Sequence, residues 1–494
     1  MAIQSIKLKP GINREGTRYT TEGGYYDGDK IRFRQGTPEK IGGWQQISTS
    51  TFEGVCRSLH NWVTLGGQNL IGVGTHLKFY IENIGTYFDV SPLRATVSLS
   101  NPFTTVSGSA VVTVADSNGG YQDGDYVTFS NASAVGGLTI DGEFVVSLSV
   151  TTAANSYSIT ASSNATSSAT GGGTVSAAYQ INVGNPFAVP IEGWGASSWG
   201  SGAWNVGESS TTAIRFFSQS NFGEDLIFGN NGGSIFYWDA TGSVTTRAVL
   251  LSTLSGASDV PVVQNLILVS DISRFVFCFG TNEIGSDTID PTLLRWSDQE
   301  DATNWTPSAT NQAGSLRLSR GTKIVAASQA RQEVLVWTDS SLYSLQYVGA
   351  PAVWAATLVG ENISISSQNA VAYANGVAYW MGKDKFYMYD GRTQPLKCDV
   401  RKYIFNDFNT AQYSQVFSGT NESFHEVWWF YCSDGETNID KYVIYNYLDK
   451  IWYYGTLART AWLDSGLRDS PLAATYTLNL VDHESGVDDN QTTS

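Results

Sequence analysis

The sequence predicts an all-β protein: a β-propeller of about six blades with a small β-sandwich or barrel inserted into it. Three observations support this prediction: a recurring hairpin pattern, the spacing of its copies, and one interval too long for a blade. The 494 residues include 50 glycines but only 12 prolines, which indicates many tight turns rather than disorder. Alternating stretches such as "YVTF" and "FVVSLSV" indicate half-buried strands, and no window has the period of an amphipathic helix.

The hairpin pattern is an apolar strand, a polar or glycine-rich turn, and an aromatic strand. Four windows align without a gap: 70–83, 226–239, 334–347 and 377–390. Longer versions begin at Phe275 and Val427, so the starts from the second window onward are 49, 59, 43 and 50 residues apart. Repeats of about 40–50 residues made of short strands are typical of propeller blades, whose sheets bury their faces against each other. A set of unrelated hairpins is the alternative interpretation.

The first two windows start 156 residues apart, far more than one blade needs. Within this interval, alternating strands separated by "DGD" and "GG" turns predict an inserted β domain at 95–178. We therefore divide the chain into a basic N-terminal segment (1–45), a first propeller part (46–94), the inserted domain (95–178), the remaining blades (179–480) and an acidic tail (481–494).

The net charge of −16 is unevenly distributed. Residues 1–45 contain eight basic and five acidic residues, whereas 95–214 contain seven acidic residues and no lysine or arginine. Tight nucleic-acid binding requires Lys and Arg to neutralise phosphates and release counterions. Most of the chain is therefore expected to avoid firm contact with DNA.

No motif for catalysis, metal binding or cofactor binding is present. The cysteines, Cys56, Cys278, Cys398 and Cys432, are widely spaced and are expected to be reduced core residues. "SDQEDATNW" from Ser297 resembles the aspartate turns of some glycosidase propellers, which are structural, and its neighbours Glu300 and Asp301 are expected to form a solvated turn. We predict no enzyme activity, no cofactor and no membrane insertion. The lack of an apolar signal segment favours synthesis in a reducing cytoplasm.

Two segments are candidate subunit contacts. The tryptophans of "EGWGASSWGSGAWN", Trp194, Trp199 and Trp204, are expected to plug a surface or a contact between subunits, since Trp-Gly loops usually serve packing. A platform for stacking carbohydrate is the alternative. Arg32 and Arg34 lie in the basic N-terminal segment, which is expected to lie on a neighbouring subunit, the alternative being a solvated arm.

Several phrases resemble one protein family. They are "KPGINREGTRYTTEGGYYDGDKIRFRQGTPEKIGGW" from Lys9, "DYVTFSNASAVGGLTIDGEF" from Asp125, "NFGEDLIF" from Asn221 and "LRWSDQEDATNWTP" from Leu294. Together they resemble the tail nozzle proteins of short-tailed bacteriophages, also called packaged-DNA stabilisation proteins. The resemblance extends from about Lys9 to Asp489, and its first two phrases are the most specific.

This resemblance implies a structural virion protein that assembles in the host cytoplasm into a homohexameric ring at the viral tail. The ring would contact adaptor and portal-side proteins, and double-stranded DNA would pass transiently through its axis, without sequence preference. An acidic channel wall would let DNA slide, because it repels phosphate. Retention would then need a constriction, for which the loop Gly280–Asp290, with Glu283, Asp287 and Asp290, is the candidate gate. A glycan-binding or glycan-cleaving propeller is the main alternative, and a bacterial surface adhesin is a third.

Overall fold

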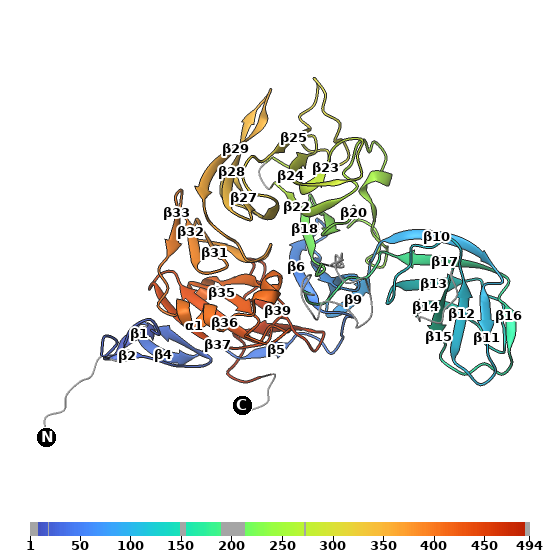
Figure 1. The fold of residues 1–494 in the computed structure, drawn as a ribbon, viewed down its shortest axis with the longest axis horizontal. Helices are drawn as coiled ribbons and strands as arrows, with labels where there is room; N and C mark the ends of the chain where they lie inside the picture. The colour runs from blue at the N-terminus through green and yellow to red at the C-terminus, as the bar shows by residue number, and fades with distance from the viewer. Residues whose placement is uncertain (1–7, 18, 149–154, 189–212, 271–272, 490–494) are drawn as a thin grey trace, which may run out of the picture.

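The computed structural model describes residues 8–17, 19–148, 155–188, 213–270 and 273–489. Seven four-stranded antiparallel sheets are arranged around a common axis, and a two-sheet domain lies beside them (Figure 1). This arrangement is a seven-bladed β-propeller with an inserted β-sandwich. The predicted fold class is confirmed, with one blade more than the expected six.

The first strand of each blade lies nearest the axis and the fourth lies outermost. Blades 1 to 3 comprise β6 (Cys56–Val63), β7 (Asn69–Thr75), β8 (Phe79–Asn83), β9 (Thr86–Asp89); β18 (Phe217–Phe222), β19 (Asp225–Asn230), β20 (Ile235–Trp238), β21 (Val249–Leu250); and β22 (Gln264–Val269), β23 (Val276–Asn282), β24 (Ile289–Trp296), β25 (Gly314–Arg317).

Blades 4 to 6 continue this pattern, with β26 (Ile324–Gln329), β27 (Val334–Thr338), β28 (Ser341–Gly349), β29 (Val353–Glu361); β30 (Val371–Ala374), β31 (Val377–Met381), β32 (Phe386–Tyr389), β33 (Thr393–Leu396); and β34 (Phe417–Asn421), β35 (Glu426–Tyr431), β36 (Lys441–Asn446), β37 (Ile451–Thr456). Helical segments within the described ranges are few and short: η1 (Leu251–Thr253), α1 (Arg401–Asn406), η2 (Thr410–Gln415) and η3 (Glu422–Phe424).

Blade 7 combines both ends of the chain. Its first three strands are β38 (Ala461–Leu463), β39 (Leu472–Ala474) and β40 (Leu480–His483), and its outermost strand is β5 (Trp44–Gln46). The first strands of successive blades contact one another around the whole ring, including β38 with β6. The N-terminal strand therefore closes the propeller, and β40 occupies the start of the predicted acidic tail.

The recurring hairpins of the sequence are the second and third strands of blades. Windows 70–83, 226–239, 334–347 and 377–390 fall in blades 1, 2, 4 and 5, and the longer versions fall in blades 3 and 6. Blade 7 has no such window because its second and third strands are short and its fourth strand lies more than 400 residues away in sequence. The expected count of about six blades followed from this missing signal.

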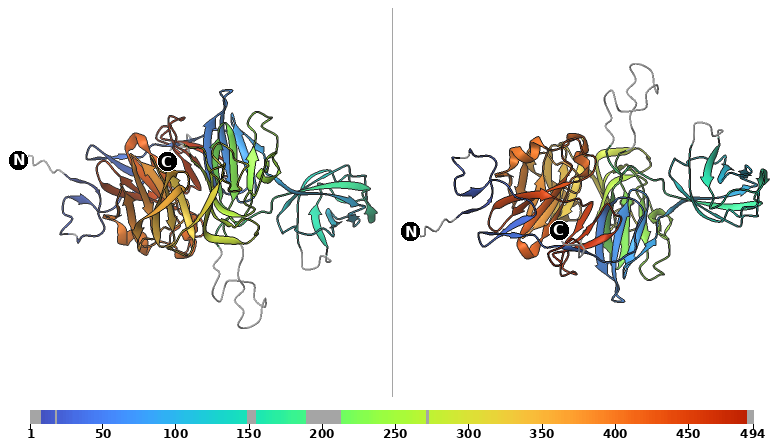
Figure 2. Two further views of the ribbon diagram at one scale, coloured as in Figure 1. Left: turned by 90° about the horizontal axis from the view of Figure 1, so that it is seen from above. Right: turned by 90° about the horizontal axis from the view of Figure 1, so that it is seen from below.

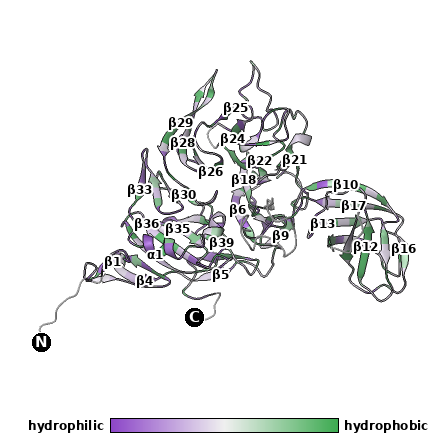
Figure 3. Cartoon of the chain, in the orientation of Figure 1, coloured by the Kyte–Doolittle hydropathy of each residue, from purple (hydrophilic) through white to green (hydrophobic). Residues whose placement is uncertain are grey.

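Close approach between blades requires small residues on the facing strands. At Gly419 of β34, a Cβ would lie 2.1 Å from Cδ1 of Trp462 on β38. Large side chains fill the wider gaps, as where Trp337 of blade 4 and Trp380 of blade 5 meet edge to face, with ring centroids 5.4 Å apart. Figure 3 shows hydrophobic residues along the strands of the blades and the sandwich.

The N-terminal residues fold onto blade 6 of the same chain instead of extending away from it. The parallel pair β1 (Lys9–Ile12) and β2 (Gly24–Tyr25) is followed by the hairpin of β3 (Ile31–Arg34) and β4 (Thr37–Lys40). Both β1 and β3 contact β37. This placement differs from the expected arm on a neighbouring subunit.

The inserted domain is a sandwich of two four-stranded sheets spanning Leu93–Gln180, slightly wider than 95–178. One sheet contains β10 (Leu93–Ser100), β17 (Thr174–Gln180), β13 (Tyr126–Ser130) and β14 (Gly142–Val145), and the other β15 (Ser156–Thr160), β12 (Val111–Ala115), β11 (Phe103–Thr105) and β16 (Ala169–Gly171). Its first and last strands pair with each other, Leu93 opposite Gln180. Figures 1 and 2 show the domain beside the ring, on the side away from the N-terminal strands.

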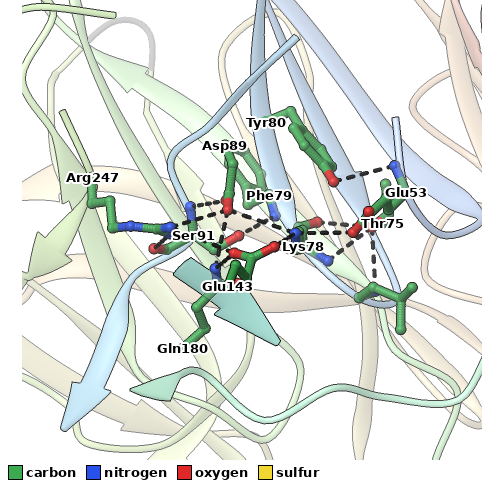
Figure 4. A network of polar contacts seen from close by, with 11 residues as sticks. Glu53, Thr75, Lys78, Phe79, Tyr80, Asp89, Ser91, Glu143, Gln180 and Arg247 are labelled. Atoms are coloured by element: carbon green, nitrogen blue, oxygen red, sulfur yellow. Dashed lines mark hydrogen bonds and ion pairs between the residues drawn. The ribbon is translucent and has the colours of Figure 1, made fainter. Parts of the chain in front are cut away.

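A polar network holds the sandwich against blades 1 and 2 (Figure 4). Lys78, only 4% exposed, places Nζ 2.5 Å from Glu143 of the sandwich and 2.9 Å from Glu53. Asp89 of blade 1 accepts hydrogen bonds from Gln180 of the sandwich and Arg247 of blade 2. Burial alone would lower the pKa of Lys78, but the two glutamates raise it above its usual value. Lys78 is therefore charged and fixes the joint.

Candidate functional site: the acidic face of the propeller

The two faces of the ring can be distinguished by the direction of the strands. Because successive strands of a blade are antiparallel, the turns from first to second strand and from third to fourth strand lie on one face. We term this the turn face, and it includes the residues after β40. The opposite face, termed the link face, carries the turns from second to third strand and the links between blades.

The turn face is much more acidic than the link face. Its described connections contain fourteen acidic and six basic residues, whereas those of the link face contain eleven and ten. The acidic residues of the turn face are Glu224, Asp239, Asp298, Glu300, Asp301, Glu333, Asp390, Glu422, Asp449, Asp464, Asp469, Glu484, Asp488 and Asp489. Most of the acidic excess of the described connections therefore lies on one face of the propeller.

Burial strengthens this excess at the surface. Among the described residues, six cations are buried against four acids: Arg32, Arg57, Lys78, Arg215, Arg295 and Arg459 against Glu82, Asp116, Asp125 and Glu426. The exposed surface is consequently more acidic than the composition alone indicates.

The acidic residues of the insertion contribute little to this surface, contrary to what its lack of basic residues suggested. Asp116 and Asp125 are buried, where Asp116 accepts a hydrogen bond from Tyr179 at 2.6 Å. Glu143 is ion-paired with Lys78. Asp123, Asp141 and Glu143 are the exposed acids among the described residues of the sandwich, and the charge of Glu143 is offset by Lys78.

The predicted gate residues lie on the link face and on the outer wall of blade 3. Strands β23 and β24 extend further than expected, leaving a turn of only 283–288. Arg317 of the outermost strand binds Glu283 at 2.6 Å and Asp290 at 2.5 Å. Asp287 is exposed. This placement does not support the predicted gate, because two of its three acids are held against the outer wall.

The same turn is pinned by a residue that the sequence analysis did not single out. Asn282, 3% exposed, accepts hydrogen bonds from the backbone N–H groups of Val262 and Val263 and donates to the carbonyl of Ser286. No local sequence signal identifies this role, since Val262 and Val263 belong to the preceding link between blades.

The aspartate turn is structural, as its sequence suggested. Asp301 accepts hydrogen bonds from the backbone and hydroxyl of Thr303, at 2.8 and 2.7 Å. Trp305, 1% exposed, packs beneath the turn and donates to the carbonyl of Ala302. Glu300 is exposed, and it is not brought together with Asp301 across a pocket.

The predicted subunit-contact residues have different surroundings. Arg32 is 2% exposed and forms ion pairs with Glu426 and Glu484 of its own chain, so it is not available to another subunit. Arg34 is exposed at the end of β3. Trp194, Trp199 and Trp204 lie outside the described residues.

The described residues flanking this tryptophan segment are attached to the link face. The N–H of Arg215 donates to the carbonyl of Asn185, which joins the two flanks. Ala188 exchanges two hydrogen bonds with the side chain of Gln412, and Arg57 of the innermost strand of blade 1 donates to the carbonyl of Pro186. The chain at 185–188 therefore spans from blade 1 to the link between blades 5 and 6.

No constellation for metal chemistry occurs in the described ranges: no three His, Cys, Asp or Glu residues are grouped to hold an ion. All four cysteines are buried and free. Burial raises the pKa of Cys56 to about 12, which makes its thiol unreactive. No helix in the part of the chain that the structure describes is long and apolar enough to cross a membrane.

Comparison with known proteins adds the following findings. No protein-family model matches the sequence, and no curated protein matches it. Among solved structures, Hsv2 of Kluyveromyces lactis is similar over 55% of this chain and 74% of its own, at 12% identity and a TM-score of 0.32. The phage phi92 endosialidase is similar over 95% and 65%, at 11% identity and a TM-score of 0.21. An apocarotenoid oxygenase of Synechocystis is similar over 78% and 88%, at 7% identity and 0.31. At these scores the likenesses carry no argument about function.

Proposed function

We propose that this protein is a structural component of a short-tailed bacteriophage tail, forming a nozzle ring that channels packaged DNA and retains it until ejection. Support comes from the resemblance of its N-terminal and insertion phrases to that family. The observation that carries the proposal is the separation of charge between the two faces. A surface of net negative charge repels phosphates, so DNA can pass without binding.

In this proposal six copies of the chain form the nozzle ring. DNA passes along the axis of this hexamer and not along the axis of a single propeller. The innermost strands of the seven blades contact each other, which leaves the propeller's own axis narrow. The sandwich extends sideways and exposes apolar side chains, including Val106 (58%), Val111 (49%) and Val145 (48%). We propose that it reaches a neighbouring copy, while adaptor and portal-side proteins bind the ends of the ring at the virion tail.

Electron microscopy of purified virions and of the isolated protein tests this proposal. A six-fold ring at the tail axis, and a hexamer by light scattering, are the expected results. Duplex DNA at physiological salt should show no submicromolar affinity. A monomer that is absent from purified particles would contradict the proposal.

A glycan-binding propeller is the second candidate, because one hollow has suitable chemistry. A hollow of about 360 Å³ beside blade 3 is lined by Asp259, Asn282, Asp287 and Arg295, together with serine hydroxyls. Arg295 is 2% exposed and donates to the carbonyls of Asp259 and Asn282. Such groups can bind sugar hydroxyls. Saccharide binding that is lost in Asn282→Ala, in a protein that stays monomeric, would favour this candidate.

A further inference from the structure

A second hollow lies at the seam where the N-terminal strand closes the ring. It has a volume of about 690 Å³ and lies between blade 6, blade 7 and residues of the N-terminal segment. Lys30, Trp44, Leu457, Arg459 and Val481 are among its lining residues. Three separate parts of the chain therefore meet around it, and the function proposed above does not use it.

Arg459 is a buried cation whose charge is compensated only in part. Its side chain donates to Nε2 of His483 at 2.9 Å and to the carbonyl of Ala458 at 2.8 Å, and its Nη2 has no partner. Burial lowers the pKa of Arg459 to about 10, which Asp489 opposes only partly. An unpaired buried guanidinium is costly, so an anionic occupant would stabilise it.

The groups around Arg459 are arranged to leave its charge for another partner. His483, 2% exposed, is a neutral acceptor, since burial and the adjacent Arg459 lower its pKa well below the usual value. The two acids of the lining have hydrogen-bond donors of their own: Asp440 accepts from the backbone N–H and hydroxyl of Ser433, and Asp489 accepts from the indole N–H of Trp44.

A second cation lies against the same aromatic ring. The guanidinium carbon of Arg459 is 4.7 Å from the centroid of Trp44, and Nζ of Lys30 is 5.9 Å from it. Leu457 and Val481 add apolar surface to the hollow. The hollow thus combines two cations with an aromatic and aliphatic wall, which suits an anionic group on an apolar body.

We propose that this hollow binds a carboxylate group through Arg459 and Lys30, with the attached carbon chain lying against Trp44 and Val481. A planar carboxylate matches the fork of a guanidinium. Phosphate is less suitable, because it carries a charge of about −1.5 to −2 and the lining already contains two acids. The carboxylate has two possible sources, a free carboxylic acid or a glutamate side chain of a polypeptide.

Calorimetric titration of the full chain tests the proposal with three probes: acetate, the blocked peptide acetyl-Gly-Glu-Gly-amide, and phosphate at matched ionic strength. We expect either carboxylate probe to bind more tightly than phosphate. Tighter binding of the peptide identifies a polypeptide source, and equal binding identifies a free acid.

Variants then locate the binding. Arg459→Met should lower the affinity for the better carboxylate probe by about tenfold or more, because one charged hydrogen-bonding partner is lost. The melting temperature should stay unchanged. Lys30→Met, at the rim, should lower the affinity less and serves if Arg459→Met does not fold. Arg468→Met is the matched control: this arginine of blade 7 pairs with Asp482 outside the hollow and should leave affinity unchanged. Absence of binding to the unaltered protein, preference for phosphate, or unchanged affinity in both Arg459→Met and Lys30→Met would overturn the proposal.

Discussion

Arg32 and Glu426 form a bidentate ion pair inside the propeller, with Nε–Oε1 and Nη2–Oε2 distances of 3.0 and 3.1 Å. Their side chains are 2% and 0% exposed. Arg32 also binds Glu484, which follows the third strand of blade 7. A single side chain of the N-terminal hairpin therefore connects blade 6 to the C-terminal end of the chain.

We predict that Arg32→Met lowers the free energy of unfolding by about 3–5 kcal/mol, because it leaves Glu426 buried without a cation. Urea unfolding followed by tryptophan fluorescence measures this change. Arg34→Met is the matched control on the same strand, and it should stay within about 0.5 kcal/mol because Arg34 is exposed. Equal losses in the two variants would show that Arg32 is not a structural clamp.

The effect of Arg32→Met should depend on pH. Burial raises the pKa of Glu426 from 4.5 to about 7, despite the opposing effect of Arg32. A carboxyl whose pKa rises on folding favours the folded state below 4.5 and loses this contribution as the pH rises towards 7. Without Arg32 the rise in pKa is larger. The stability deficit of the variant should therefore be smaller at pH 5 than at pH 8, and a deficit independent of pH would contradict this assignment.

Contact between blades 6 and 7 depends on the absence of a side chain at Gly419. An alanine there would place its Cβ 2.1 Å from Trp462, whose indole N–H is held by the carbonyl of Thr420. Gly419→Ala should destabilise the protein by about 1–3 kcal/mol through overpacking.

The control for this prediction is Gly466→Ala, since nothing lies within 4 Å of a Cβ at that position. Chemical unfolding of both variants compares them directly. A neutral Gly419→Ala would mean that the blades can separate at this seam without loss.

Much of the fold follows from the sequence because the signals are local. Each hairpin window encodes the apolar second strand and aromatic third strand of one blade, and the broken spacing encodes the insertion. Blade 7 has no comparable signal, because β5 and β40 pair across the whole length of the chain. The ion pairs of Arg32 could not be predicted for the same reason, since Glu426 and Glu484 are distant from it in sequence.

The candidate site was less accessible to sequence analysis. The net charge of the sequence predicted an acidic surface. It could not predict which face of the propeller carries the acidic residues, because this depends on which turns fall on each face. The gate interpretation rested on the length of the loop at 280–290, which strand pairing shortened to 283–288. The insertion adds less charge to the surface than its composition suggests, because Asp116 and Asp125 are buried and hydrogen-bonded and Glu143 is paired with Lys78.

The inserted sandwich should be removable without unfolding the propeller. Leu93 and Gln180 are register partners on adjacent strands, so a short glycine-serine linker can replace 94–179. The sandwich also has its own hydrophobic core, including Phe103, Val127 and Tyr157. We expect the deletion variant to keep the near-ultraviolet circular dichroism of a folded propeller, with a lower melting temperature because Lys78 loses Glu143.

Lys78→Met in the full-length chain is the companion variant. It leaves Glu53 and Glu143 without their shared cation and should loosen the joint, seen as faster proteolysis between the sandwich and blade 1. General unfolding of the deletion variant would show that the sandwich belongs to the propeller core.

Charge reversal on one face is the sharpest test of the proposed DNA path. Glu300, Asp449 and Asp469 are exposed acids of the turn face, and replacing all three with lysine raises the net charge there by six units. If this face lines the channel, the new lysines bind passing phosphates, so ejection from particles should slow at low salt and recover at high salt. For three new phosphate contacts the slope of log affinity against log salt should steepen by about 2.7.

The link-face variant Asp287→Lys, Asp434→Lys, Glu436→Lys carries the same charge change and should eject normally. Slower ejection from the link-face variant than from the turn-face variant would show that DNA passes along the link face of the propeller.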